Sequence, residues 1–450
     1  MASDLIQIAS SGARAMRAAL DVTAQNIANA STDGYIRRSV NLAEMSSVDS
    51  RSSYGDVSQY GVRMAGINRN VDAFQQGEVR RTNADATRAD TLVTGLSNIS
   101  DAVDNSGVFD AITAFQSAIT KLSSAPTDSS LRANMLEAAR TMAQSFNVAH
   151  NSLASAMSGQ QETAAAGVAD MNTLAQNLAA LNLRIASDTD PLNNRATLLD
   201  QRDAILQQMS SYGDIATTIN ANSTVDVKLG GTGGRDLVSF GTAHTLASTI
   251  TASGASAGTI SYTIDGAALT LSGGSLAGHQ QVLVAAATAN ATLDGVANTM
   301  MATVNTAQTN GADLAGAAGT AMFTGAASGA SAMTLALSNG SKIATAPAGS
   351  PAGSQISSNL SALQSALSGA NVAGQMNDLL YGMASSVASN TITRDALDSI
   401  ANNAKTTLAN QSGVSLDTEA ANLVKYQQAF QASGKVIQVA STMFDQLLNL

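Results

Sequence analysis

The chain has 450 residues, with 12% charged residues, 3% aromatic residues, no Trp and no Cys. This length gives room for several domains and a sizeable core, and the net charge of -10 at pH 7 disfavours a nucleic-acid surface, which needs clustered Lys and Arg. Without Cys, neither a disulfide framework nor a thiolate metal site can form. Small residues replace large ones, which favours helices packed through small side chains.

The first residues do not resemble a secretory leader. No basic segment precedes a continuous apolar core there, and no run of roughly 18 apolar residues occurs in the sequence. We therefore expect neither a Sec signal peptide nor a membrane-spanning segment.

The N-terminal segment predicts an amphipathic helix. Ser3 is suited to cap it, with Asp4 in the first turn. Its large apolar residues are Leu5, Ile8, Met16, Leu20 and Ile27. The small residues beside them are Gly12, Ala15 and Ala19. A stripe of large residues next to a groove of small ones is what two pairing helices need.

A helical bundle is expected in the next part of the chain. After a turn at residues 31–34, residues 35–45 alternate enough to be extended, and residues 46–69 predict irregular structure with short strands. The helical segments that follow are 80–105, 109–124, 131–160, 165–187 and 198–211. We expect a bundle domain formed from residues 46–212 and 275–409.

The pattern changes to strands after residue 212. The predicted strands are 215–219, 225–229, 237–240, 259–264 and 268–271. Gly-rich and Asp-Gly turns separate them, as in antiparallel hairpins. Residues 213–274 are therefore expected to form a small β domain inserted into a helical protein.

Helices return at about 282–309 and 357–408. Between them, residues 324–353 contain Pro347 and Pro351 among Ala, Gly and Ser, which favours a short flexible insert. The expected fold class is mainly α with an inserted β domain.

The last helix, residues 415–450, has the most regular pattern. Large apolar residues recur there every seven positions. They are Leu416, Leu423, Phe430, Ile437 and Phe444, with Tyr426, Ala440, Leu447 and Leu448 three or four positions after members of the series. This repeat is typical of a coiled-coil seam and predicts left-handed winding around a partner. On periodicity alone, a core helix of a bundle is an equal alternative.

The two terminal helices are expected to pair. Each large side chain left in water forgoes about 1.5 to 3 kcal/mol of burial, so the last helix needs a partner. Residues 1–45 and 410–450 should form a terminal coiled-coil assembly domain. Its predicted assembly seam comprises Leu5, Ile8, Leu20, Ile27, Leu416, Leu423, Phe430, Ile437, Phe444 and Leu447.

Several segments resemble one family. The sequence QNIANASTDGY at 25–35 resembles the N-terminal signature of bacterial flagellar axial proteins, although Asp33 stands where proline is common. The segments at 122–128, 198–203 and 416–430 are similar to the hook-associated protein 1 family among them.

This resemblance implies a structural subunit, not an enzyme, that self-assembles as a junction ring between hook and filament. It also implies contacts with the hook protein, with hook-associated protein 3 and, before export, with a cytoplasmic chaperone at the C-terminal helix. The implied location is extracellular, on the flagellum, reached by type III export without a cleaved signal peptide. No cofactor is implied.

No catalytic, cofactor-binding or metal site is predicted. His150, His244 and His279 stand far apart, without a second ligand at a suitable spacing. The Gly-rich segment 230–236 lacks the Gly-Lys-Ser/Thr of a phosphate loop, and a hairpin turn explains it.

The carboxylates of the LLDQRD segment at 198–203 also need no catalytic interpretation. Asp200, Arg202 and Asp203 are expected to form helix-surface ion pairs, each worth less than about 1 kcal/mol if exposed.

Three alternatives stay open. A hook or distal rod subunit would differ in the neighbour that it caps. A cell-wall glycan hydrolase would need two carboxyl groups about 5 to 9.5 Å apart in a cleft. A secreted coiled-coil adhesin would bind ligands through the β segment.

Overall fold

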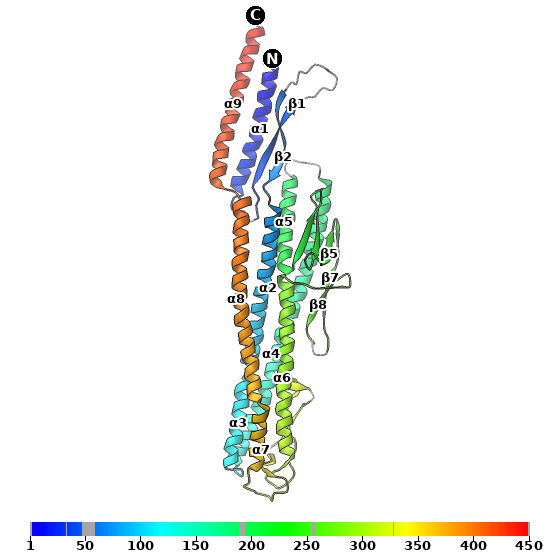
Figure 1. Cartoon of the computed structure of the whole chain (residues 1–450), viewed down its shortest axis with the longest axis vertical. Helices are drawn as coiled ribbons and strands as arrows, with labels where there is room; N and C mark the ends of the chain where they lie inside the picture. The colour runs from blue at the N-terminus through cyan, green and yellow to red at the C-terminus, as the bar shows by residue number, and fades with distance from the viewer. Residues whose placement is uncertain are drawn as a thin grey trace. The chain divides into compact units, whose positions relative to one another are not determined.

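A computed structural model describes residues 2–32, 34–46, 59–188, 194–253, 257–326 and 328–448. The chain is mainly helical with small antiparallel sheets, as the sequence predicts (Figure 1). It divides into two compact units. Unit 1 comprises Met1–Ala84, Met171–Thr245 and Asp398–Leu450, and unit 2 comprises Asp85–Asp170 and Leu246–Leu397.

The two ends of the chain pair in unit 1, as predicted. Helix α1 (Ala2–Ala28) packs along α9 (Leu416–Leu448) (Figure 1). Small residues are buried in both helices: Ala15, Ala19 and Ala440 are all at most 3% exposed. At Gly12 a Cβ atom would lie 3.3 Å from Ser433 Oγ, so the backbones come close. Left-handed winding of the pair stays a prediction.

A β-hairpin lies against α1. Strands β1 (Arg38–Ser46) and β2 (Gln59–Arg69) pair antiparallel, and both contact α1. The predicted extended segment at 35–45 is therefore confirmed, whereas much of the predicted irregular segment lies outside the described residues. Ser11 Oγ accepts a hydrogen bond from the Val62 amide at 3.1 Å, and Gly61 has a φ of 97° where the strand crosses the helix.

The other helices are close to the predicted segments. They are α2 (Ala73–Asp104), α3 (Val108–Ser124), α4 (Ser129–Ser187), α5 (Asn194–Tyr212), α6 (Gly274–Thr309), α7 (Ser358–Ala370) and α8 (Val372–Ser412). One prediction is wrong: the two helices expected at 131–160 and 165–187 are the single helix α4. No Gly or Pro interrupts residues 161–164, and Ala164 is fully buried, so the helix continues through them.

The β segment forms two separate sheets. In unit 1 four antiparallel strands lie in the order β3-β4-β5-β6, and in unit 2 three lie in the order β7-β8-β9. Their bounds are Ile215–Ile219, Val225–Leu229, Arg235–Ser239, Thr242–Ala243, Leu246–Ile250, Ile260–Ile264 and Ala267–Leu269. The sequence pattern missed β6 and β7. The Gly-rich segment is the β4–β5 hairpin turn, as predicted, with positive φ at Gly230 and Gly231.

Unit 2 has a large apolar core. It is formed by side chains of α3, α4, α6 and α7, and Phe115 meets Phe323 edge-on with ring centroids 6.3 Å apart. The segment expected to be a short flexible insert contributes to this core, since Met333 and Ile343 are buried in it. Its short elements are β11 (Phe323–Thr324), η1 (Gly329–Ala332), β12 (Thr334–Leu335), η2 (Gly340–Lys342) and β13 (Ala346–Pro347), the last paired with β10 (Gly311–Ala312).

A buried arginine fixes this segment. Arg132 of α4 is 1% exposed, and its guanidinium donates to backbone oxygens and one hydroxyl. The acceptors are the Pro126, Gly340 and Ile343 carbonyls at 2.6, 3.1 and 2.9 Å, and Thr345 Oγ1 at 2.8 Å. These bonds hold the loop against α4.

The three-domain division predicted from sequence stays a prediction. The two compact units cut the chain at other places, and in particular they separate β6 from β7 within residues 213–274.

We expect Gly61→Ala to destabilise unit 1. The added Cβ would lie 2.1 Å from Ser11 Oγ and 3.2 Å from Ile8 Cα, at a φ that L-residues rarely adopt. The free energy of unfolding in urea should fall by about 1 to 3 kcal/mol. Gly434→Ala is the control, because nothing lies within 4 Å of the added atom, and it should be neutral or stabilise by up to about 1 kcal/mol. Equal effects of the two changes would contradict the close approach.

We expect Arg132→Leu to destabilise unit 2 strongly, because it leaves buried carbonyl oxygens without donors. The loss should be about 3 to 5 kcal/mol in a denaturant titration. Arg140→Leu on the same helix removes an exposed arginine paired with Glu137 and should cost less than about 1 kcal/mol.

Candidate assembly surface

Metal-ligating side chains do not cluster among the described residues. None of them forms a group of three or more His, Asp or Glu side chains able to hold a metal ion. His279 is 7% exposed, with Nδ1 2.7 Å from Gln160 Oε1, and burial lowers its pKa. Within the same residues, no helix has an apolar stretch long enough to cross a lipid bilayer.

The predicted seam residues do not form the centre of the α1–α9 contact. On α1, Leu5 and Ile8 are exposed, whereas Leu20 and Ile27 are half-buried. On α9, Leu423 and Ile437 are half-buried, and Leu416, Phe430 and Phe444 are exposed. The side chain of Leu447 lies outside the described residues. Whether these residues act in assembly stays a prediction.

A second series with the same spacing of seven faces α1. It consists of Glu419, Tyr426, Ser433 and Ala440, of which Glu419 and Ala440 are buried and the other two half-buried. The sequence analysis named Tyr426 and Ala440 of this series, as positions three or four after the large apolar residues, and did not include them in the predicted seam. Ser433 and Ala440 are small and Glu419 has polar partners, which explains why these three lie at the contact while the larger series lies at its edge.

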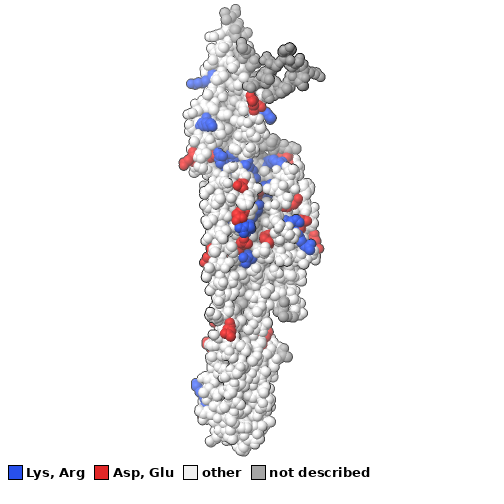
Figure 2. All heavy atoms as spheres, viewed as in Figure 1, with Lys and Arg blue, Asp and Glu red and all other residues white. Residues whose placement is uncertain are grey.

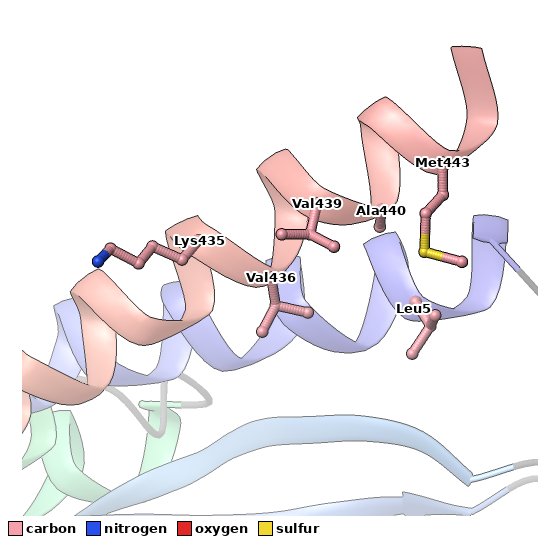
Figure 3. A pocket seen from close by; sticks show the side chains of 6 residues that line it. All are labelled: Leu5, Lys435, Val436, Val439, Ala440 and Met443. Carbon is pink, nitrogen blue, oxygen red and sulfur yellow. The ribbon is translucent and has the colours of Figure 1, made fainter. Parts of the chain in front are cut away.

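The exposed apolar side chains continue around α9. Val436, Val439 and Met443 are 45%, 59% and 48% exposed. Together with Leu5 of α1 they border an apolar hollow of about 230 Å³ (Figure 3). Its lining is completed by Lys435 and Ala440. In Figure 3 the side chain of Met443 extends from α9 toward Leu5 of α1, and Val436 and Val439 lie further along α9. Because all three side chains of α9 are about half-exposed, the paired helices leave part of this apolar surface uncovered.

The first turn of α9 carries one buried carboxylate. Glu419 is 1% exposed, and its carboxylate oxygens accept from Arg37 Nε at 2.7 Å and from Asn26 Nδ2 at 3.2 Å. Asn26 also bonds both the amide and the carbonyl of Arg38. We call Glu419, Arg37 and Asn26 the Glu419 cluster.

The LLDQRD segment forms a second polar group in unit 1. Asp200 pairs with Arg38 at 2.5 Å and with Arg69 at 2.7 Å. Asp203 pairs with Arg69 and with Arg202, each at 2.7 Å. These residues form ion pairs, as predicted, but the pairs are not exposed on the helix surface: Asp203 is 12% exposed, and the pairs join α5 to the base of the β1–β2 hairpin. Sequence could not reveal partners more than a hundred positions away.

The electrostatics of Asp203 follow from these partners. Burial acts to raise its pKa, but Arg202 and Arg69 outweigh burial, and the pKa lies below its usual value. Gln76 Nε2 also donates to it at 3.2 Å. Figure 2 shows charged atoms gathered near the level where β2 ends and α5 begins, with wide uncharged areas elsewhere on the same face. The ion pairs of this polar group therefore connect α5 to the β1–β2 hairpin.

Paired terminal helices with uncovered apolar side chains, in a mainly helical chain, are typical of a structural subunit with a candidate assembly surface. The chain belongs to the family described as "Flagellar hook-associated protein FlgK helical domain", which matches residues 93–323. This is a family of structural, non-enzymatic flagellar proteins. Two further families match the ends: "Flagella basal body rod protein" at 6–35 and "Flagellar basal body rod FlgEFG protein C-terminal" at 408–450.

Curated relatives agree with this family. Flagellar hook-associated protein 1 of Bacillus subtilis is 30% identical over 46% of this chain and 42% of its own length. The protein of that name from Salmonella typhimurium is 25% identical over 58% of this chain and 47% of its own length. The matches thus span less than half of each relative. A solved structure, the flagellar hook junction protein FlgK from Burkholderia pseudomallei, has a TM-score of 0.49 and 22% identity, covering 55% of this chain and 46% of that one.

The lowered pKa of Asp203 predicts an acid dependence of stability. A carboxyl whose folded pKa is depressed contributes stability above its unfolded pKa, about 3.9, and loses it as pH falls through the folded pKa. Asp203→Asn should therefore lower the free energy of unfolding at pH 7 and weaken the decline of this free energy as the pH falls below about 4. Urea titrations over this range measure it, with exposed Asp101→Asn as the control. If the free energy of unfolding of the variant fell with pH as steeply as that of the unaltered chain, the ion-pair assignment would be contradicted.

Proposed function

We propose that the chain is a structural subunit that self-assembles as a ring at the junction between the flagellar hook and filament. The observation that carries this proposal is an apolar surface left uncovered on the terminal helix pair of a chain in the FlgK family. A subunit that worked alone would lose the burial energy of these side chains, whereas a neighbour can cover them.

The surface is large enough to contribute to assembly. Phe430, Val439 and Phe444 are each about half-exposed, at 41%, 59% and 47%. Covering the remaining half of such a side chain is worth on the order of 1 kcal/mol, and several act together on each subunit. Small increments repeated around a ring can give a stable assembly. Ordering of the terminal helices is then coupled to assembly, as in other segments that fold on binding.

The partners follow from the same proposal. We infer that the ring contacts the hook protein on one side and hook-associated protein 3 on the other, and that a cytoplasmic chaperone covers the C-terminal helix before type III export. Support comes from the relatives' name, hook-associated protein 1, and from the apolar face of α9, which would need covering before assembly. The location proposed is extracellular, on the flagellum.

A hook or rod subunit is the second candidate. This candidate is supported by the rod-protein families, which match both termini of the chain. However, these matches cover only the helices that the predicted assembly domain contains, and the interior match at 93–323 belongs to the hook-associated family. Because the interior distinguishes the axial proteins, the junction is the better proposal.

The junction proposal predicts binding to isolated hooks. The chain should co-sediment with hooks saturably and form caps at one hook end, and Phe430→Asp with Phe444→Asp should weaken binding at least tenfold, because two charges replace apolar contacts. Gln431→Asp with Gln438→Asp is the matched control: it adds the same charge at exposed polar positions of α9. If binding is saturable but unaffected by the Phe changes, the binding energy comes from other residues. If the folded chain does not bind hooks, the junction proposal is refuted.

A further inference from the structure

The polar group around the LLDQRD segment holds more positive than negative charge. Four guanidinium groups from four elements of unit 1 meet there with two carboxylates, so positive charge is in excess by two. The guanidinium groups, which we call the arginine group, belong to Arg38 of β1, Arg69 of β2, Arg80 of α2 and Arg202 of α5, and the carboxylates to Asp200 and Asp203 of α5. All four arginine side chains are almost completely buried. Buried charges are stable only when opposite charges or hydrogen bonds compensate for the lost water.

Arg80 has the least compensation of the four. It is 8% exposed, and within the described part of the chain no carboxylate forms an ion pair with it. Its Nη2 donates to Thr217 Oγ1 at 3.3 Å. Burial lowers the pKa of Arg80, Asp203 opposes this shift, and Arg202 adds to it. Because a guanidinium has five N–H donors, Arg80 retains donors that a ligand can use.

Arg38 and Arg69 also keep a donor without an acceptor. Both use Nη2 for their ion pairs with Asp200, and Nη2 of Arg69 pairs with Asp203 as well. The Nε atoms of both arginines are buried and have no hydrogen-bond partner among the described residues. A buried N–H without an acceptor is costly, and guanidinium N–H groups suit the oxygens of a carboxylate or phosphate.

Carboxylates on the neighbouring segments are engaged elsewhere. Glu419 pairs with Arg37 at 2.7 Å, and Glu78 pairs with Arg81 on the exposed side of α2. Tyr35, whose ring lies 5.3 Å from the Arg38 guanidinium carbon, carries no charge at neutral pH, since burial raises its pKa. The negative charge that the arginine group lacks therefore has to come from outside the chain.

The arginine group reaches the protein surface. The side chain of Asp200, which lies between Arg38 and Arg69, is 20% exposed. Figure 2 shows charged atoms at the surface near the level where β2 ends and α5 begins. An anion from solution can therefore approach the group from this side. Guanidinium groups hold oxyanions better than spherical halides, because two planar N–H groups meet two oxygens.

We propose that the arginine group is a binding site for a small oxyanion, for which inorganic phosphate is the probe. Arg69 and Arg80, both near Asp203, are its principal ligands, and Arg38 adds positive charge and its unpaired Nε. The bound ion connects α2, α5 and the β1–β2 hairpin. The site lies within unit 1 and is independent of the proposed junction function.

Equilibrium dialysis of the full chain against radiolabelled phosphate tests this site. The unaltered chain should bind phosphate saturably, and sulfate should compete whereas chloride at the same ionic strength should not. Arg80→Gln should weaken binding by about tenfold or more, because it removes a charged donor. Arg81→Gln is the matched control: it removes the neighbouring arginine of α2, whose side chain is 60% exposed, and should leave binding unchanged.

A second variant separates loss of a ligand from general disruption. Asp200→Asn removes a carboxylate that competes for Arg38 and Arg69, so it should tighten phosphate binding. If Arg80→Gln does not fold, Arg80→Lys takes its place and should weaken binding, because an ammonium lacks the planar pair of donors. Absence of saturable binding, equal competition by chloride, an equal effect of Arg81→Gln, or weaker binding by folded Asp200→Asn would each overturn the proposal.

Discussion

The close approach of α1 and α9 is the constraint on which the rest of the structure depends. Two helices can lie this near only if the facing residues are small, and Gly12, Ala15, Ala19, Ser433 and Ala440 meet that condition. The consequence is that, apart from the half-buried Tyr426, the large side chains of α9 lie at the edge of the contact. The geometry that pairs the ends of one chain therefore leaves an apolar surface uncovered, which the proposed assembly would bury.

Small residues alone bury too little area to fix the register of two long helices. The Glu419 cluster restricts this register, because a charged side chain that is only 1% exposed, such as Glu419, can occupy few alternative positions. Arg38 and Arg69 then extend this fixation to α5. The terminal pair thus combines a specific polar base with an apolar tip, an arrangement suited to a subunit that must dock in one orientation.

Sequence predicted the elements better than their contacts. Repeats in the terminal segments identified the helices and their pairing, since periodicity is local information. Periodicity did not show whether the series containing Leu423 or the series containing Tyr426 would face α1. These two residues lie on adjoining faces of α9, and only tertiary packing decides between the faces. Nor could it show that Asp200 and Asp203 meet Arg38 and Arg69, because such pairs depend on segments far apart in the chain.

Thiol labelling tests the central claim most directly, because the chain has no Cys of its own. The thiol introduced by Val439→Cys should react rapidly with a maleimide in the free subunit and at least tenfold more slowly after assembly on hook ends. The thiol of Ile219→Cys, at a β3 position of similar exposure, should react equally in both states. Unchanged reactivity at position 439 in assembled rings would contradict the account, because the apolar face of α9 would then remain uncovered.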